Sequence, residues 1–420
     1  MSAAEEIRAQ ALEVAAGWSP DGAPASWRLT AGLFAAIAAH EDLLDRLASL
    51  PADRLPALLA SAAISYLVRR DRPVPLAGYF PDPGGPQPRI DGGFPGAARA
   101  FISARLDDIV AECQGRRYQM NEVARCTQIA LGIAAAMDSL AGPASPADPA
   151  SAAGPASRAG PASRAGPASR AGPASRAGPA SRADPASPAG PIGLADLGTG
   201  AGLGLHLDRY RYLVGDQASG PRTAAMTLSC DVRGSRRPPR AVLPPIAERV
   251  GIDRHPLDPL DPAARSWLEA CAPPEASALA RLAAALGVAR RYPARLVAGD
   301  VLGALPGVLD GFPAGRQVIV TDAYLAVFLS PAQRRELAVI LARAGRNRPV
   351  TWLSLDPLVP LGPSGRDSVQ GIQLPGALVR DYQRDGVFAV LGERTFGGGT
   401  ERSRLLARAH PSGEWVEWLA

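Results

Sequence analysis

A turn with three glycines at alternate positions constrains this chain more than any other feature. The segment Leu194-Ala-Asp-Leu-Gly-Thr-Gly-Ala-Gly-Leu-Gly-Leu205 places Gly198, Gly200 and Gly202 directly after a short apolar run that is typical of a buried strand. Glycine tolerates a positive φ and lets a ligand approach the backbone closely. A helix that begins after the turn would offer unpaired amides to that ligand. The segment therefore predicts a strand, a tight turn and a helix around a ligand site.

Short apolar runs alternate with helical patterns along the chain after this turn. Each run is bounded by Gly, Pro or Asp and has the length of a buried strand. The predicted strands are 192–197, 295–298, 317–321, 350–355 and 387–391, with a closing hairpin over 405–409 and 415–419. Helical spacing covers 279–290 and 331–344. Strands that alternate with helices imply a mostly parallel sheet with helices on both faces.

The chain before the turn is predicted to be helical. Ser2 and Glu5 have the spacing of a capping box ahead of an apolar-periodic run. Further helical spacing covers 27–50, 55–68, 97–113 and 118–137. Pro and Gly residues over 73–95 interrupt these patterns and predict an irregular segment. We therefore expect an all-helical region over residues 1–140.

A short repeat separates the two parts of the chain. Residues 153–182 are five consecutive copies of Ala-Gly-Pro-Ala-Ser-Arg. Pro and Gly in every copy prevent helix and sheet, and the repeat has no apolar side chain large enough to pack. We predict a disordered linker over residues 141–190, which leaves residues 191–420 as the α/β domain.

The basic charge of the chain does not indicate nucleic-acid binding. The formal net charge is +5, the sequence has no lysine, and five of its arginines lie in the repeat. A nucleic-acid surface would instead cluster basic residues on a folded element, often with aromatic residues between them. Hydrophobic residues make up 47% of the chain, which is enough for a sizeable core.

The ends and the scattered cysteines and histidines predict a cytoplasmic protein without metal. The N-terminus lacks the basic and apolar pattern of a signal peptide, and no apolar run approaches the roughly 20 residues that a bilayer requires. The four cysteines and four histidines are too dispersed for a zinc motif. His206 or His255 could act as a general base near neutral pH, although a lone histidine is more often structural.

The glycine turn resembles the first motif of class I S-adenosylmethionine (SAM)-dependent methyltransferases, in which an acidic residue precedes Gly-x-Gly-x-Gly. Asp196 is that acidic residue, and Gly198, Gly200 and Gly202 are the glycines. The register of dinucleotide sites fails because Leu203 stands where a third glycine is required. The resemblance implies a Rossmann-like, methyltransferase-type sheet whose glycine turn binds SAM, with Asp196 near the amino acid moiety.

The same resemblance implies two further cofactor contacts. A carboxylate at the end of the second strand would bind the ribose hydroxyls, and Asp253 is the candidate, with Asp258 as the alternative. The glycine turn and Asp253 are much farther apart in the sequence than the usual spacing of about 20 residues. The resemblance therefore requires an insertion over residues 209–240. Asp300 matches the position that holds the adenine amine.

Candidate catalytic residues lie at the end of the predicted strand 317–321. Asp322 and Tyr324 end that strand at the carboxyl edge of the sheet, where α/β folds bind ligands. We therefore expect these two side chains nearest the reacting atom. The chain lacks the Asn/Asp-Pro-Pro-aromatic sequence of amino-group methyltransferases, so methylation of nucleic-acid bases is not indicated.

Further segments carry a second resemblance, which spans most of the chain outside the repeat. They are Asn121-Glu-Val-Ala-Arg125, Asp208-Arg-Tyr-Arg-Tyr212, Gly251-Ile-Asp-Arg-His-Pro-Leu-Asp258, Arg265-Ser-Trp-Leu268, Gly299-Asp300, Trp352-Leu-Ser-Leu355 and the closing segment 409–419. These segments resemble a bacterial family, domain of unknown function 2332. The family has no settled activity, so it implies a fold more firmly than a reaction.

Five residues of these segments are candidate substrate-binding residues: Asn121, Glu122, Arg125, Asp208 and Arg209. On a helix, Asn121 and Arg125 share a face, and Glu122 and Arg125 have the spacing of an ion pair. Two interpretations stay open for Arg125. It either pairs with Glu122 in solvent or binds a ligand carboxylate through a bidentate contact.

These observations favour a SAM-binding protein, with methyl transfer to a small-molecule or other, unidentified acceptor as its activity. The helical region would then cover the crevice as a lid. The alternative is a non-catalytic ligand-binding or regulatory protein that keeps the methyltransferase-like fold. The sequence does not name the acceptor or the oligomeric state.

Overall fold

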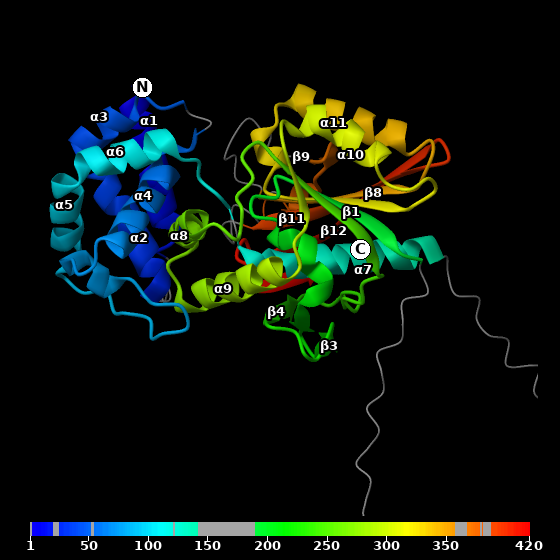
Figure 1. Cartoon of the computed structure of the whole chain (residues 1–420), viewed down its shortest axis with the longest axis horizontal. Coiled ribbons are helices and arrows are strands. Elements are labelled where there is room, and N and C mark those ends of the chain that lie inside the picture. The colour runs from blue at the N-terminus through cyan, green and yellow to red at the C-terminus, as the bar shows by residue number, and fades with distance from the viewer. Residues whose placement is uncertain are drawn as a thin grey trace, which may run out of the picture.

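Among the described residues, an 11-stranded sheet carries the glycine turn (Figure 1). The computed structural model describes residues 2–19, 25–51, 54–120, 122–141, 190–357, 368–378, 380 and 388–420. Its strands are β1 (Ile192–Leu197), β2 (Arg211–Val214), β3 (Gln217–Ser219), β4 (Thr227–Arg233), β5 (Ile246–Asp253), β6 (Arg295–Ala298), β7 (Val318–Ala323), β8 (Val350–Pro357), β11 (Ala389–Gly397), β12 (Thr400–Ala409) and β13 (Trp415–Trp418). A separate hairpin joins β9 (Ser368–Val369) to β10 (Ile372–Gln373). The repeat and Asn121 lie outside the described residues.

The strand order of the sheet is β3-β2-β4-β13-β12-β11-β8-β7-β1-β5-β6. Within the described residues, six of its ten neighbouring pairs are parallel and four are antiparallel. The structure thus confirms a mixed α/β fold with a large, mostly parallel sheet. The predicted closing hairpin is confirmed as β12 and β13.

The parallel strands reverse their order beside β1. The neighbours β6-β5-β1-β7-β8 have the order 3-2-1-4-5 along the chain, which is the order of doubly wound nucleotide-binding sheets. Connections therefore run toward β6 on one side of β1 and toward β8 on the other. In open α/β sheets, the crevice at such a reversal is where ligands bind. The glycine turn follows β1 directly and lies at this point.

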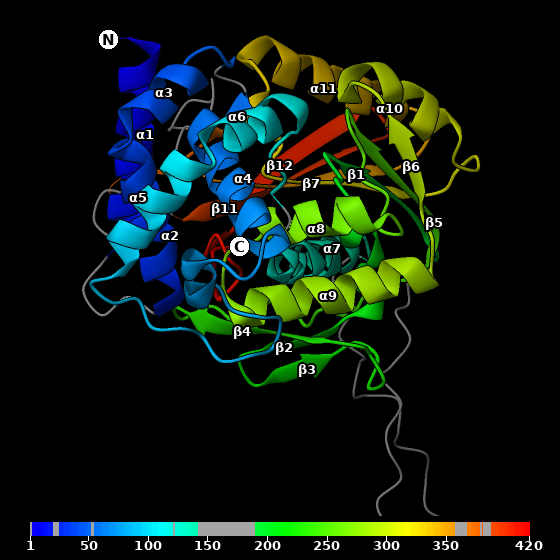
Figure 2. The same cartoon turned by 60° about the vertical axis from the view of Figure 1, so that its left-hand side comes forward.

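Helices cover both faces of the sheet, as Figures 1 and 2 show. They are α7 (Cys126–Ala141), α8 (Pro262–Cys271), α9 (Ala276–Arg291), α10 (Val301–Asp310) and α11 (Pro331–Ala344). Side chains of α7 and α9 share one apolar core with the sheet. Those of α10 and α11 share a second core with the opposite face. The central strands β1, β7 and β8 are buried along almost their whole length because helices cover both faces of the sheet.

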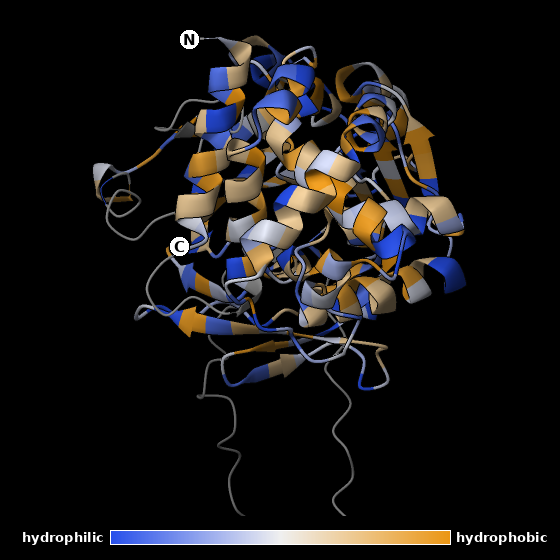
Figure 3. Cartoon of the chain, turned by 90° about the vertical axis from the view of Figure 1, so that its left-hand side faces the viewer, coloured by the Kyte–Doolittle hydropathy of each residue, from blue (hydrophilic) through white to orange (hydrophobic). Residues whose placement is uncertain are grey.

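The helical region forms a third core. Its helices are α1 (Ala3–Gly17), α2 (Ala25–Ala38), α3 (Glu41–Leu47), α4 (Pro56–Arg70), α5 (Phe94–Ala104) and α6 (Leu106–Gly115), with the 3₁₀ helix η2 (Pro75–Tyr79). The predicted capping box of Ser2 and Glu5 is confirmed. Hydrophilic and hydrophobic residues both occur on the helices of this region, as expected where one face of a helix is buried (Figure 3).

The cores do not follow the expected boundary at residue 140. One helix from each side of that boundary packs in the core of the other part. Trp267 and Cys271 of α8 are buried in the core of the helical region. Conversely, α7 packs on the sheet so closely that a Cβ atom at Gly132 would lie 3.2 Å from Leu353 and 3.3 Å from Leu391. The helical region and the sheet are therefore joined by buried apolar packing.

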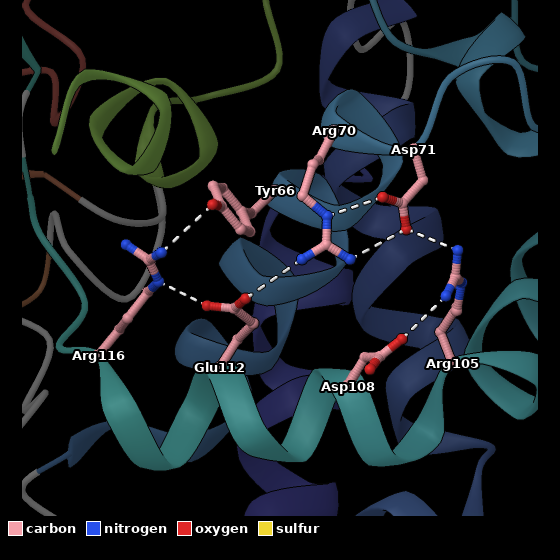
Figure 4. A network of polar contacts seen from close by, with 7 residues as sticks. All are labelled: Tyr66, Arg70, Asp71, Arg105, Asp108, Glu112 and Arg116. Carbon is pink, nitrogen blue, oxygen red and sulfur yellow. Dashed lines mark hydrogen bonds and ion pairs between the residues drawn. The ribbon is translucent and has the colours of Figure 1, made fainter. Parts of the chain in front are cut away.

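A network of polar contacts links α4 and α6 near this junction (Figure 4). The Arg116 guanidinium carbon lies 4.6 Å from the centre of the Tyr66 ring and 4.9 Å from that of Trp267. Arg116 also pairs with Glu112 at 2.5 Å. Cation–π contacts of this kind contribute about 0.5–1 kcal/mol each at exposed sites and more when desolvated.

Two local predictions about helices are wrong. The residues after the glycine turn form only the short 3₁₀ helix η5 (Leu203–Arg209), which has a kink at His206. Glu122 caps the start of the 3₁₀ helix η3 (Val123–Arg125) and Arg125 is its last residue, so the two do not lie within an α-helical turn. The required insertion over 209–240 is present as β2, β3 and β4, which pair with one another.

Replacement of Arg116 by Met keeps an unbranched side chain and removes the charge. We expect the free energy of unfolding to fall by about 1–2 kcal/mol, because two ring contacts and one ion pair are lost. Urea denaturation measures this change. Arg237→Gln is the matched control, since its partner Asp216 is 78% exposed and the pair is worth little. Equal stability of the two variants would contradict a role for Arg116 in joining the helices.

Candidate functional site

The backbone of the glycine turn has the conformation that the sequence predicts. Gly198, Gly200 and Gly202 have φ values of 68°, 58° and 75°, a region that favours glycine. Their amides, however, already have partners within the chain. Gly198 donates to Ile252 O at 2.8 Å, and Gly202 donates to Thr199 O at 2.9 Å. The turn is therefore held by β5 and by itself, and is not an open row of free amides.

Asp253 at the end of β5 holds the middle of the turn. Its Oδ2 accepts from the Gly200 amide at 3.0 Å, and its Oδ1 accepts from the His255 amide at 2.7 Å. The Leu257 amide donates to Gly200 O at 3.1 Å, so the chain after β5 lies across the turn. A carboxylate has about four acceptor positions, and each oxygen of Asp253 keeps capacity for another donor.

A cavity of about 70 Å³ lies at the carboxyl ends of β1 and β7. The glycine turn forms one wall through Gly198 and Thr199, and the segment around η3 forms the opposite wall. Polar side chains that line it are Glu122, Arg125, Asp196, Thr199 and Thr321. The fold thus brings the predicted acidic residue of the turn and two of the predicted substrate-binding residues into one cavity at the reversal of strand order.

Asp196 accepts two hydroxyl hydrogen bonds in this cavity. Thr199 Oγ1 donates to its Oδ2 at 2.7 Å, and Thr321 Oγ1 donates to its Oδ1 at 2.8 Å. Burial raises the pKa of Asp196 to about 6, against the lowering effect of the two threonine hydroxyls. Asp196 is therefore largely ionised at neutral pH, and no cation forms an ion pair with it among the described residues.

Arg125 is the cation of the cavity. Its guanidinium carbon lies 3.7 Å from the centre of the Tyr324 ring, and its Nε donates to Pro411 O at 2.8 Å. Its Nη1 is buried and has no hydrogen-bond partner in the described part of the chain. Of the two interpretations left open for Arg125, the pair with Glu122 is not formed, because Glu122 pairs with Arg281 at 3.1 Å. Glu122 Oε1 also accepts from the Ala124 amide at 3.0 Å, so this oxygen has two partners other than Arg125.

The cavity therefore contains one carboxylate and one guanidinium that each lack a charged partner within the described residues. Burial of an unpaired charge is costly, so structural sites usually pair such groups directly. A ligand that carries a cation and an anion would satisfy both side chains. This arrangement is the strongest indication of a binding site in the molecule.

Asp322 and Tyr324 lie differently from the sequence-based expectation. Thr321 and Ala323 line the cavity, whereas Asp322 points to the opposite face because side chains alternate along β7. There Asp322 is fully buried and accepts from Trp352 Nε1 at 2.7 Å and from Ser354 Oγ at 2.9 Å. Burial and then the neighbouring Asp356 raise its pKa well above the ordinary value.

Tyr324 does not line the cavity but packs against Arg125, which does. Its ring is 5% exposed and lies under the Arg125 guanidinium, while its hydroxyl has no partner among the described residues. Its φ of 68° is unusual for a residue with a side chain and marks the abrupt end of β7. Burial raises the pKa of Tyr324 to about 12, so the phenol is neutral.

The other predicted site residues have local partners outside this cavity. Asp208 forms a bidentate pair with Arg249 at 2.9 and 3.0 Å, which ties η5 to β5. The guanidinium carbon of Arg209 lies 4.0 Å from the centre of the ring of Tyr292, the residue that follows α9. Asp300 follows β6, caps α10 through the Leu302 amide and pairs with Arg254 at 2.7 Å. The Arg254 contact lowers the pKa of Asp300.

Sequence reasoning missed Thr199 and Thr321. Both are small hydroxyl residues at the carboxyl ends of neighbouring parallel strands, and the pairing of Asp196 with Thr321 brings them to one carboxylate. Their proximity follows only from the pairing of β1 with β7, which the sequence does not show. A Thr between two turn glycines was the only signal in the sequence.

The described residues show neither a membrane-type helix nor a metal-type cluster. None of the helices there combines the length and apolar character needed to cross a bilayer. In the same residues, no three His, Cys, Asp or Glu side chains gather as metal ligands would. All four cysteines are buried free thiols.

The fold and the cavity define an α/β protein with a charged cleft at the reversal of its strand order. The family model described as "Uncharacterized protein conserved in bacteria (DUF2332)" matches residues 5–154 and 179–418. The chain therefore belongs to the DUF2332 family, and the match includes both the helical region and the sheet. Neither a curated protein nor a solved structure matches the chain. The family assignment identifies the chain without giving it an activity.

Replacement of Asp196 by Asn tests the charge in the cavity. Because its folded-state pKa lies near 6, above the usual 3.8, the folded state binds the proton more tightly, and Asp196 lowers stability as pH rises through this window. From pH 4 to pH 8, the unfolding free energy of the variant should rise relative to wild type by about 2 kcal/mol.

Urea denaturation at several pH values measures this difference. Asp300→Asn provides a control of opposite sign, because the pKa of Asp300 is lowered and its ionised form stabilises the fold as pH rises. Parallel stability curves for wild type and the Asp196→Asn variant would show that Asp196 is not held as the structure indicates.

Proposed function

We propose that this protein binds SAM, or a close relative of it, with the amino acid moiety of the ligand in the cavity beside the glycine turn. One observation carries this proposal: Asp196 and Arg125 lie in the same cavity, and neither has a charged partner among the described residues. An α-amino acid moiety has an ammonium group for the first and a carboxylate for the second. Arginine is well suited to the carboxylate because its N–H groups form paired bonds.

The size of the cavity limits which part of the ligand it takes. Pockets for whole cofactors usually measure about 300–1,000 Å³, whereas this one measures about 70 Å³. It therefore accommodates a head group, and the nucleoside would extend along the glycine turn toward β5. Asp253 ends β5 and keeps acceptor capacity for a ribose hydroxyl beyond its bonds to the amides of Gly200 and His255.

SAM supplies an activated methyl group when it is bound, so methyl transfer is the reaction that this ligand supports. Such a displacement requires mainly alignment and exclusion of water. The alternative is a binding or regulatory protein without catalysis. Two observations favour that alternative: the Gly200 amide is already bonded to Asp253, and Asp322 is buried on the opposite face of β7.

Titration calorimetry with SAM and its demethylated product tests the binding proposal. We expect saturable binding of both, and a loss of about 10–100-fold in affinity for Arg125→Gln, since a hydrogen bond to a charged group contributes about 1.5–3 kcal/mol. Arg237→Gln is the matched control and should bind as wild type does. Absence of saturation with either ligand would overturn the proposal.

A second measurement separates the two candidate functions. The protein is incubated with SAM labelled in its methyl group and with bacterial extract as the source of acceptors. Transfer of label that is lost in Arg125→Gln supports a methyltransferase. Saturable binding without any transfer supports the non-catalytic alternative.

A further inference from the structure

A larger cavity of about 310 Å³ lies on the other side of the glycine turn. Residues of η5, α9, β6 and the segment after β5 form its walls. Its main lining residues are Gly202, His206, Pro256, Asp258, Pro293 and Leu296. It shares no lining residue with the cavity of Asp196 and Arg125. Its volume falls within the range of about 300–1,000 Å³ that is typical of small-molecule sites.

One polar side chain in this cavity lacks a partner. His206 is 1% exposed, and its Nδ1 has no hydrogen bond among the described residues. Leaving a buried polar group unpaired costs roughly 1–3 kcal/mol, so proteins usually satisfy such groups. The ring lies at the kink of η5, where the backbone φ of −109° departs from helical values. A ligand atom in the cavity would supply the missing hydrogen bond.

The groups around His206 do not select a charged ligand. Burial, and next the charge of Arg249, lower the pKa of His206 to about 4, so the imidazole is neutral at physiological pH. Arg249 is itself engaged by both carboxylate oxygens of Asp208. The other ionisable residue in the lining is Asp258, which is exposed and repels anions. The remaining lining is apolar, with two leucines and three prolines as its largest members.

We propose that this cavity is a second ligand site, which binds an uncharged, largely apolar small molecule through a hydroxyl group bonded to His206. A neutral imidazole has one N–H donor and one acceptor nitrogen. A hydroxyl group both donates and accepts, so it satisfies His206 in either tautomer. The apolar body of the ligand packs against Leu296, Pro256 and Pro293. The site does not depend on SAM binding, because its residues are separate from those of the first cavity.

Calorimetry of the whole chain with p-cresol and toluene tests this proposal. The two probes have the same apolar body and differ in the hydroxyl group. We expect p-cresol to bind at least about tenfold more tightly than toluene, which corresponds to about 1.4 kcal/mol. The anion p-toluate should bind more weakly than p-cresol, because no free cation lines the cavity in the described residues.

Two variants assign the binding to this cavity. His206→Phe keeps a ring and removes the nitrogen, so the preference for p-cresol over toluene should disappear. Ala294→Leu adds volume inside the cavity and should abolish binding of both probes. Ala9→Leu, at an exposed position of α1, is the matched control and should leave both affinities unchanged.

The outcomes decide the proposal even if His206→Phe fails to fold. Equal affinity of wild type for p-cresol and toluene, or p-cresol binding that survives Ala294→Leu, would overturn it, as would the absence of p-cresol binding at millimolar concentration. The Arg125→Gln variant should still bind p-cresol. A loss of SAM binding with retained p-cresol binding therefore separates the two sites.

Discussion

The reversal of strand order at β1 is the constraint on which the rest of this structure depends. Parallel strands require crossovers, and helices of successive crossovers must cover both faces of the sheet. Here α9 covers one face, and α10 and α11 cover the other. Because the connections diverge at β1, the carboxyl ends of β1 and β7 are left accessible to the segment around η3. The charged cavity is a consequence of this topology.

Electrostatics give that cavity its character. The carboxylate of Asp196 is held by two hydroxyl groups and not by a cation, so its negative charge is not neutralised by the groups that orient it. Arg125 is fixed by a ring and a backbone carbonyl, which likewise leave its charge uncompensated. Neutral partners thus orient both groups without cancelling them. Preorganisation of this kind lowers the cost of binding a charged ligand, which is what the proposed function requires.

The sequence allowed much of the fold to be predicted and less of the site. The strand 192–197 and the helix 331–344 have the predicted bounds, since apolar run length and a capping box define them. Asp322 was misjudged because adjacent residues of a strand face opposite sides, and which side holds the cavity depends on neighbouring strands. The expected helix after the turn is replaced by η5 because the chain there proceeds to β2, a connection that local periodicity does not reveal.

The packing of α7 on the sheet and of α8 in the helical region determines whether either part can fold as a separate fragment. A fragment that begins at residue 191 would lack α7, and the sheet residues Leu353 and Leu391 that touch Gly132 would meet water. A fragment that ends at residue 140 would lack Trp267, whose indole donates to Arg117 O at 2.8 Å within the helical core. Each part thus completes the interior of the other. We therefore expect the two parts to unfold together in one transition, although the repeat lies between them in the sequence.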